Sequence, residues 1–347
     1  MDKVTIAGLL VPDEPIYAIL TLVSGIFWTI VYIDIIYRGF KDKACGMPLM
    51  VLGLNWSWEF IFAFMGEPFF EKGSFFCVTE QTMVQRGVDA VWFLFDCVIL
   101  YLKFKYGREE FNHSLPGFGK KMFIPYILFI LFVSFQAVWF ISMELEDHQG
   151  AYAAYQQNIF ISSLYIPMLL RRGNTDGQSM VIAISKCLGT LAPDVMGAIV
   201  LLKAYHVPWQ KFVLMETMPY MKLLIGSCLL FDLVYIITLY RAFKKEGKNP
   251  WTRKPLPGYV QSDDPHVWVP EEVAAGIYIK ETPEKYSAEL VSGAKVETPP
   301  NSSQCTKPPK LYLFNMSASH SLQLPRCRCC CCCCLSRFSH VRLCVTP

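Results

Sequence analysis

Seven apolar blocks, each about as long as a membrane crossing, dominate this sequence. A helix rises about 1.5 Å per residue, so about 20 residues cross a hydrocarbon core of about 30 Å. The blocks are Pro15–Tyr37, Met47–Phe64, Met83–Tyr101, Phe123–Met143, Tyr152–Leu170, Met180–Leu202 and Pro219–Tyr240. Because backbone polar groups in lipid must pair within their own segment, such blocks predict helices. The predicted fold class is therefore all-α, a polytopic membrane protein with seven transmembrane helices.

The basic residues between the blocks predict the orientation. Lys and Arg concentrate in the first, third and fifth connections and after the last block. Cytosolic loops are enriched in these residues. We therefore expect a lumenal N-terminus (residues 1–14) and a cytosolic C-terminus. The net charge of +3 describes loops rather than a nucleic-acid-binding face, and the first block is too long for a cleaved signal peptide.

The domain boundaries follow from a change in composition. The membrane domain is expected over residues 15–245, and residues 246–347 read as a cytosolic, mostly disordered tail rich in Pro, Glu, Lys and Ser. The tail ends in an uninterrupted run, Cys329–Cys334, which lacks the ligand spacing of a zinc site. Palmitoylation near the membrane and a misjoined gene model both explain this run.

A short pattern occurs twice in the chain. In each copy a Tyr-Ile pair is followed by Arg-Gly, by another glycine and by an apolar run, and the copies begin at Tyr32 and Tyr165. One explanation is that helices one to three and five to seven are parallel repeats joined by helix four. Chance similarity between two basic turns explains the pattern equally well.

Glu59 places a carboxyl group inside the apolar block Met47–Phe64. Such a group costs about 2.5–3.5 kcal/mol at a helix centre on insertion scales, so it is usually neutralised, paired or functional. Asn55 lies four residues earlier and shares its helix face, so its amide is expected to hydrogen-bond the carboxyl group. Trp56 flanks this face, whereas Trp58 points about 100° away.

Asp232 is a second carboxyl group in an apolar block, and Tyr235 follows it by three residues. Helical rise places Glu59 and Asp232 about 10 Å apart along the membrane normal, so both can line one cavity. A carboxyl group in an apolar setting can stay protonated at neutral pH and act as an acid. Structural hydrogen bonding between helices is the alternative role for each.

Three further intramembrane acids carry no motif: Asp89, Asp96 and Asp194. Any of them is a possible proton donor. Asp89 is expected to form a salt bridge with Arg86 three residues earlier. Lys186 is expected either to pair with Asp194 or to extend toward the membrane surface.

Two short motifs carry a resemblance to a known family. Residues 55–59 match the pattern Asn-X-X-Trp-Glu, and residues 232–235 match Asp-X-X-Tyr. The chain resembles, over residues 15–245, the small seven-helix membrane terpene cyclases of fungal meroterpenoid and indole-diterpene pathways, of the paspaline and pyripyropene types. The resemblance implies cyclisation of a prenyl chain that bears a terminal epoxide, started by protonation of the epoxide oxygen.

The resemblance also assigns roles to residues. The essential acid pair would map onto Glu59 and Asp232. Substrate binding or cation stabilisation would fall to a polar and aromatic set, Asn55, Trp56, Trp58 and Tyr235. An aromatic face can stabilise a carbocation as it does other cations.

The expected partners follow from the same resemblance. They are a hydrophobic, epoxidised prenyl substrate, membrane lipid, and a prenyltransferase and an epoxidase of the same pathway. Location in the endoplasmic reticulum is implied, with no cofactor, no metal and no loss of diphosphate. The sequence itself contains no Asp-rich diphosphate motif and no His cluster of the kind that binds a metal.

Two other functions suit seven helices. A small-solute transporter of the PQ-loop type would use a similar pair of repeats, but neither repeat has a Pro-Gln pair at the expected turn. A seven-helix receptor is the other alternative, although the loops are short and the usual Asp-Arg-Tyr signal is absent.

Overall fold

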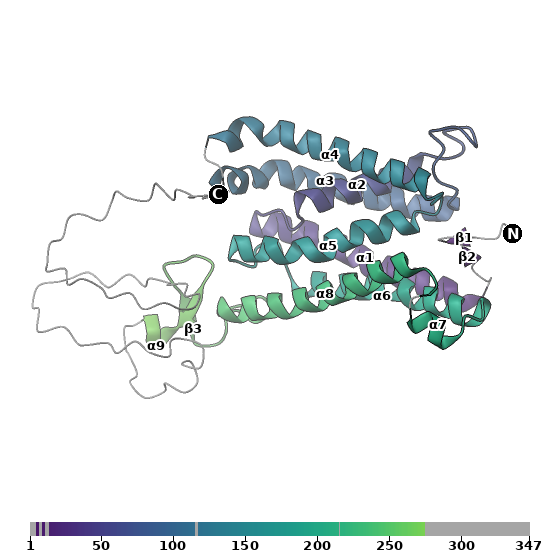
Figure 1. The fold of residues 1–347 in the computed structure, drawn as a ribbon. Coiled ribbons are helices and arrows are strands. Elements are labelled where there is room, and N and C mark those ends of the chain that lie inside the picture. The colour runs from purple at the N-terminus through teal and green to yellow at the C-terminus, as the bar shows by residue number, and fades with distance from the viewer. Residues whose placement is uncertain (1–4, 7–8, 11–13, 115–116, 215, 275–347) are drawn as a thin grey trace, which may run out of the picture. The chain divides into compact units, whose positions relative to one another are not determined.

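The computed structural model describes residues 5–6, 9–10, 14–114, 117–214 and 216–274. A long helix covers each of the seven predicted blocks (Figure 1). These helices are α1 (Pro15–Asp42), α2 (Leu49–Phe64), α3 (Met83–Ser114), α4 (Phe118–Glu144), α5 (Ala151–Arg172), α6 (Met180–Ile199) and α8 (Pro219–Lys245). A π-helical turn, η1 (Val200–Ala204), extends α6, and the short helix α7 (Trp209–Val213) precedes α8.

The remaining elements are short. An antiparallel pair, β1 (Thr5–Ile6) and β2 (Leu9–Leu10), precedes α1. A second antiparallel pair, β3 (Tyr259–Gln261) and β4 (Trp268–Pro270), follows α8 with Val260 opposite Val269, and it leads into α9 (Glu271–Ala274).

Several helices are longer than their apolar blocks. The largest difference is in α3, which continues from the predicted end at Tyr101 to Ser114. The added residues include Lys, Arg and Glu, which favour helix but not lipid. Hydropathy therefore marks the part of a helix that suits the bilayer and misses its polar extension.

The helices are distributed as in a membrane protein. Within the described residues, α1, α4, α6 with η1, and α8 are long and apolar enough to cross a membrane, and α2 is apolar but shorter. Large apolar side chains such as Leu22, Phe132 and Leu230 are exposed on the outside of the helices. Several charged side chains are buried among the apolar ones inside, which is rare in a soluble protein.

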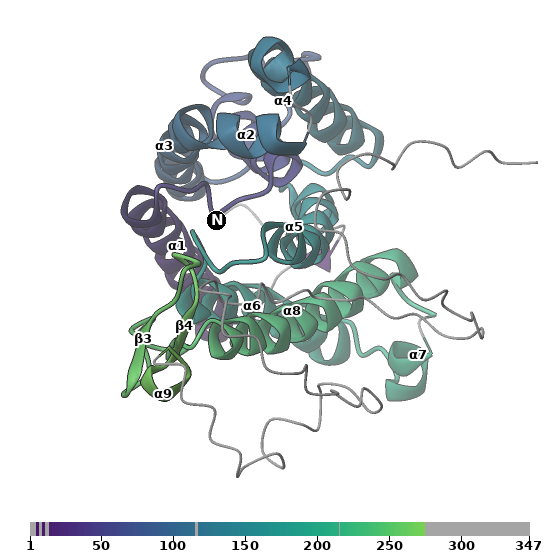
Figure 2. The ribbon, with the colours of Figure 1, turned by 90° about the vertical axis from the view of Figure 1, so that its left-hand side faces the viewer.

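Helix packing supports the two repeats. Helix α1 packs along α6 as α5 packs along α2, and both α1 and α2 contact α3 as α5 and α6 contact α8. Figure 2 shows α1 and α5 between the α2–α3–α4 group and the α6–α8 pair. If α1, α2 and α3 exchanged places with α5, α6 and α8, these same pairs of helices would still be in contact. This is what two repeats of one three-helix unit predict.

The turns after α1 and α5 pack directly on each other. A Cβ atom on Gly46 would lie only 2.3 Å from the Gly177 carbonyl oxygen. The backbone N–H of Gly177 donates to Asp42 at 2.8 Å, and Arg172 donates to the Cys45 carbonyl at 2.6 Å. Glycine at both turns is required by this close approach, which explains part of the repeated pattern.

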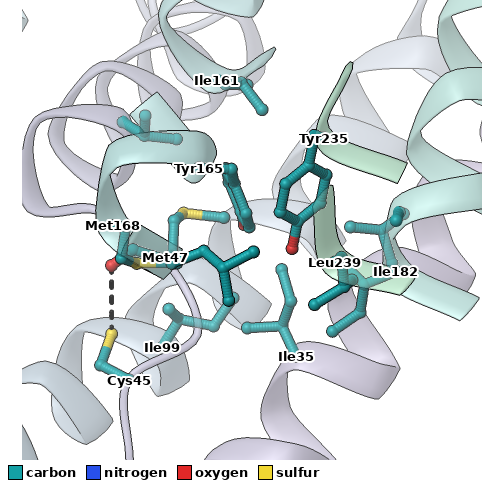
Figure 3. Packing of buried hydrophobic residues seen from close by; sticks show 14 of the residues in the cluster. Ile35, Cys45, Met47, Ile99, Ile161, Tyr165, Met168, Ile182, Tyr235 and Leu239 are labelled. Carbon is teal, nitrogen blue, oxygen red and sulfur yellow. Dashed lines mark hydrogen bonds between the residues drawn. The ribbon is translucent and has the colours of Figure 1, made fainter. Parts of the chain in front are cut away.

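The core beside these turns is apolar and aromatic (Figure 3). Tyr165 of α5 and Tyr235 of α8 meet edge to face, with ring centroids 5.3 Å apart. Ile35, Ile182 and Leu239 around them are fully buried. Six helices thereby share one core, because α2 and α3 contribute to the same cluster.

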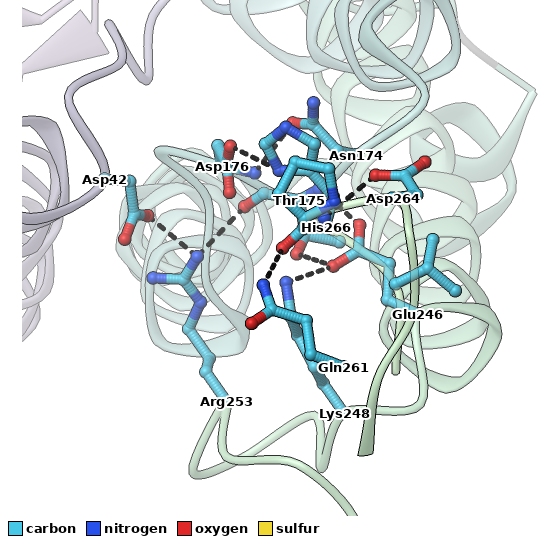
Figure 4. A network of polar contacts seen from close by, with 12 residues as sticks. Asp42, Asn174, Thr175, Asp176, Glu246, Lys248, Arg253, Gln261, Asp264 and His266 are labelled. Carbon is cyan, nitrogen blue, oxygen red and sulfur yellow. Dashed lines mark hydrogen bonds and ion pairs between the residues drawn. The ribbon is translucent and has the colours of Figure 1, made fainter. Parts of the chain in front are cut away.

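Residues 246–274 differ from the sequence prediction. They belong to the segment expected to be mostly disordered, yet they contain β3, β4 and α9 and bind the turns after α1 and α5 (Figure 4). Glu246 accepts hydrogen bonds from the backbone and hydroxyl of Thr175 at 2.6 and 2.7 Å, and Arg253 pairs with Asp42 at 2.7 Å. Residues 275–347, including the cysteine run, lie outside the described residues.

One acid of this network is partly buried. Asp176, in the turn after α5, forms an ion pair with His266 at 3.0 Å. Burial raises the pKa of Asp176, and the nearby His266 acts in the opposite direction. The contact ties the chain after β3 to the membrane domain.

The connections alternate between two ends of the helices. Those after α1, α5 and α8 meet in the contacts just described. Those after α2 and α4 meet at the other end, where the backbone N–H of Glu80 donates to the His148 carbonyl at 3.0 Å and the Trp58 indole donates to the Gly150 carbonyl at 3.0 Å. Such alternation is what a chain crossing a membrane repeatedly requires.

Candidate active site

Asn55 of α2 lies at the centre of a buried polar cluster. Its amide nitrogen is 2.5 Å from the Tyr32 hydroxyl of α1, 2.9 Å from Glu59 Oε1 and 3.0 Å from Asp96 Oδ2 of α3. The predicted hydrogen bond between Asn55 and Glu59 is confirmed. The structure adds a second carboxyl group, that of Asp96, to the same amide.

The orientation of the Asn55 amide is set from a fourth helix. Gln157 of α5 donates to Asn55 Oδ1 at 3.3 Å. Because the oxygen of an amide accepts and its nitrogen donates, this contact turns the nitrogen toward the two carboxyl groups. Four helices therefore determine the position of one side chain.

Tyr32 closes the cluster on the α1 side. Its hydroxyl donates to Glu59 Oε1. The rings of Trp92 and Phe95 lie with their centroids 5.9 and 6.0 Å from the Tyr32 ring. Glu59 and Asp96 are 1% and 0% exposed, so the two carboxyl groups are sealed from solvent.

Each carboxyl group keeps one free oxygen. Within the described residues, Glu59 Oε2 and Asp96 Oδ1 are buried and have no hydrogen-bond partner. No lysine, arginine or histidine in that part of the chain forms an ion pair with either group. Buried polar atoms are normally paired, so each exception needs an explanation, of which a catalytic role is one. The cluster thus combines fixed carboxyl groups with oxygens that are available to a proton or a ligand.

Asp232 lies in a different polar cluster. It forms an ion pair with Lys186 of α6, and both side chains are fully buried. The Lys186 ammonium also donates to the Ser162 hydroxyl of α5 at 3.1 Å and lies 5.9 Å from the centre of the Tyr165 ring. The structure gives Asp232 no direct contact with Glu59.

This ion pair overturns the expectation for Lys186. The sequence suggested Asp194 as its partner or an extension toward the membrane surface, and both are wrong because Lys186 points to α8. Asp194 instead accepts a hydrogen bond from Tyr155 of α5 at 2.5 Å.

The expected salt bridge between Arg86 and Asp89 is also wrong. The Arg86 guanidinium donates to the backbone carbonyls of Ala63, at 3.0 Å, and Glu67. Asp89 accepts from Gln85 at 2.8 Å. Arg86 therefore binds carbonyl groups at and just after the end of α2, where the backbone offers no further helical N–H to pair with them.

The predicted aromatic residues do not all surround Glu59. Trp56 packs against Phe60 and Phe93, with centroids 5.8 and 5.2 Å away. Trp58 donates to a backbone carbonyl at the α4–α5 turn. Tyr235 donates to Gln178 at 2.6 Å within the apolar core.

Sequence reasoning missed the roles of Tyr32 and Gln157 and left Asp96 unassigned. Tyr32 was marked by the repeated pattern, and Asp96 by its depth in an apolar block. Neither signal names a partner. Within the described residues, no three side chains of the metal-binding types come close enough together to hold a metal ion.

Comparison with known proteins adds independent information. The family model of Pyr4-like transmembrane terpene cyclases matches residues 13–245. The chain is 28% identical over 195 residues to Pyr4-family terpene cyclase mfmH of Annulohypoxylon moriforme, covering 54% of this chain and 74% of that protein. Asnovolin H synthase nvfL of Aspergillus novofumigatus is 30% identical over 182 residues, with coverage of 51% and 68%.

A longer match is less identical. Terpene cyclase pyr4 of Aspergillus fumigatus shares 22% identity over 233 residues, with coverage of 66% of this chain and 87% of that protein. No solved structure matches the chain significantly. The region matched by the family model contains both polar clusters.

Proposed function

The chain belongs to the Pyr4-like transmembrane terpene cyclases, and we propose that it cyclises an epoxidised prenyl chain of a meroterpenoid or indole-diterpene precursor. The observation that carries this proposal is the buried carboxyl group of Glu59, which has one oxygen bound by Tyr32 and Asn55 and the other without a partner among the described residues. Such a group can hold a proton and present it to a neutral oxygen in an apolar setting.

The proposed reaction begins with proton transfer from Glu59 to the epoxide oxygen. The bond from that oxygen to the more substituted carbon breaks as the π electrons of a neighbouring alkene form a new carbon–carbon bond. The oxygen becomes a hydroxyl group, and the positive charge moves along the chain until a base removes a proton from the last cation. The product is therefore an isomer of the substrate.

The neighbours of Glu59 suit both ends of the transfer. Hydrogen bonds from Tyr32 and Asn55 stabilise the carboxylate that remains after the proton leaves. The nearby rings of Trp92 and Phe95 offer aromatic faces to a cation. Asp232 serves as the second acid or as the group that orients the first, and no metal takes part in this proposal.

The membrane setting is part of the same proposal. All seven long helices cross the bilayer, with the N-terminus in the lumen and the C-terminus in the cytosol, and the protein resides in the endoplasmic reticulum. A prenyl substrate reaches the site from the lipid phase, after a prenyltransferase and an epoxidase have made it. The family match favours a cyclase over the transporter and receptor alternatives.

Membrane fractions that contain the intact chain test the proposal when they are fed epoxyfarnesyl and epoxygeranylgeranyl aromatic substrates. We expect cyclised product from the intact chain and its loss in Glu59→Gln and Asp232→Asn at unchanged expression. Glu71→Gln, the same chemical change at an exposed loop position, is expected to keep full activity.

Two outcomes would contradict these assignments. Product that persists in Glu59→Gln would remove Glu59 as the proton donor. Substrate uptake without chemical change by a correctly inserted chain would replace the cyclase with a carrier.

A further inference from the structure

We propose that Asp96 and Glu59 form one proton-donating carboxyl pair, with Asn55 as the positioning residue that binds both. The inference rests on the proposed function and deepens it, because it assigns an acid that no motif marks. Of the two roles proposed for Asp232, it leaves that of an orienting group, because the acid that shares a donor with Glu59 is Asp96.

The first argument is the number of hydrogens in the cluster. The Asn55 amide nitrogen carries two hydrogens, yet three oxygens lie within 3.0 Å of it, those of Tyr32, Glu59 and Asp96. Tyr32 adds one hydrogen, which goes to Glu59. These hydrogens leave Glu59 Oε2 and Asp96 Oδ1 unpaired. A proton on either free oxygen supplies what the cluster lacks.

The second argument is charge. The two carboxyl groups contact the same nitrogen and, within the described residues, neither has a cationic partner. Two adjacent buried carboxylates repel each other, and such pairs retain a proton. Asp232 differs because the Lys186 ammonium neutralises it. Of the two acids in the family motifs, Glu59 and Asp232, Glu59 is therefore the one that keeps a proton to give.

The groups that face Glu59 can be followed helix by helix. Tyr32 of α1 and Asp96 and Asp89 of α3 are the titratable groups that act on it. Helix α5 contributes the neutral amide of Gln157, through Asn55. Helix α4 contributes no charged contact to Glu59 among the described residues. Asp96 is the one of these acids that shares a hydrogen-bond donor with Glu59.

A pH profile of cyclisation distinguishes this pairing from a structural role. The acid works only while it is protonated, so activity falls as the pH rises. Asp96→Asn removes a negative neighbour, which makes Glu59 easier to ionise, and the fall should move to lower pH by about one unit or more. Glu71→Gln, which removes a carboxylate at an exposed loop position, should leave the profile in place. Asp96→Glu, which restores a carboxyl group, should return the profile toward that of the intact chain.

Infrared spectroscopy of purified protein in lipid nanodiscs tests the pair without substrate. The carbonyl stretch of a protonated carboxyl group shifts when its hydrogen-bond partner changes. We expect Glu59→Gln to shift the band that remains from Asp96, and Asp96→Asn to shift that of Glu59. Bands that respond independently would overturn the pairing, even if the intact chain made no product.

The activity assay separates the two proposals. Loss of product in Glu59→Gln together with an unchanged pH profile in Asp96→Asn would overturn the pair and leave the cyclase intact. Absence of product from the intact chain would overturn the proposed function, and the infrared bands would still decide the pairing.

Discussion

Removing the charge of Lys186 should destabilise the bundle strongly. Lys186→Met keeps an unbranched apolar stem but leaves Asp232 buried without its cation and Ser162 without its donor. Breaking a fully buried ion pair from one side costs about 3–5 kcal/mol. For a domain of this size, about 1 kcal/mol lowers the melting temperature by about 2–4 °C, so we expect a decrease of about 6–20 °C.

Thermal unfolding in detergent, followed by tryptophan fluorescence, measures this decrease. Lys203→Met removes the same charge from an exposed position in η1 and should change stability by no more than about 0.5 kcal/mol. Lys186→Met combined with Asp232→Leu should recover most of the loss, because an apolar pair in place of an ion pair is often neutral.

The reasoning fails if Lys186→Met has the same melting temperature as Lys203→Met. It also fails if the double variant is as unstable as the two single changes added together, since residues in contact are not additive. A large, recoverable loss would show that Asp232 has a structural partner whatever its role in catalysis. Glu59→Gln, which breaks no ion pair, should lose activity with little change in melting temperature.

Two further changes probe the connections between helices. Gly46→Ala would bring a Cβ atom to 2.3 Å from the Gly177 carbonyl oxygen, so it should cost about 1–3 kcal/mol of stability through overpacking. The control Gly25→Ala has open space in α1 and should be neutral or stabilising by about 0.5–1 kcal/mol. Equal melting temperatures for the two variants would contradict the close approach. Asp147 accepts hydrogen bonds from the backbone N–H groups of Ala151 and Ala153, both at 2.9 Å, at the start of α5. Asp147→Ala should therefore cost about 1–2 kcal/mol of stability in the same assay. Asp147→Asn keeps one acceptor oxygen and should cost less.

How far the sequence predicts the fold depends on the range of the interactions. A bilayer requires apolar side chains on the outside of each helix, so hydropathy locates all the long helices. It cannot locate the end of α3, where the helix continues as polar residues. It also misses the order of residues 246–274, because Arg253 and Glu246 bind turns that are distant in sequence.

The candidate site shows the same limit. The contact between Asn55 and Glu59 follows from their spacing on one helix, and the sequence predicts it. The contact between Asn55 and Asp96 joins residues on different helices, and so does that between Lys186 and Asp232. Spacing rules say that such buried charges need partners, but only the packing of helices chooses the partner.

The two repeats place different donors at matching positions. Asn55 follows Gly46 by nine residues, as Lys186 follows Gly177. Each donor reaches an aspartate on the third helix of its own repeat, Asp96 in one and Asp232 in the other. An amide is neutral, so the first pair must balance its charge with a proton. An ammonium balances the second pair by itself, so that pair ties α6 to α8 without one. The difference between Asn55 in the first repeat and Lys186 in the second therefore decides the role of each cluster. The first holds a proton, and the second holds two helices together.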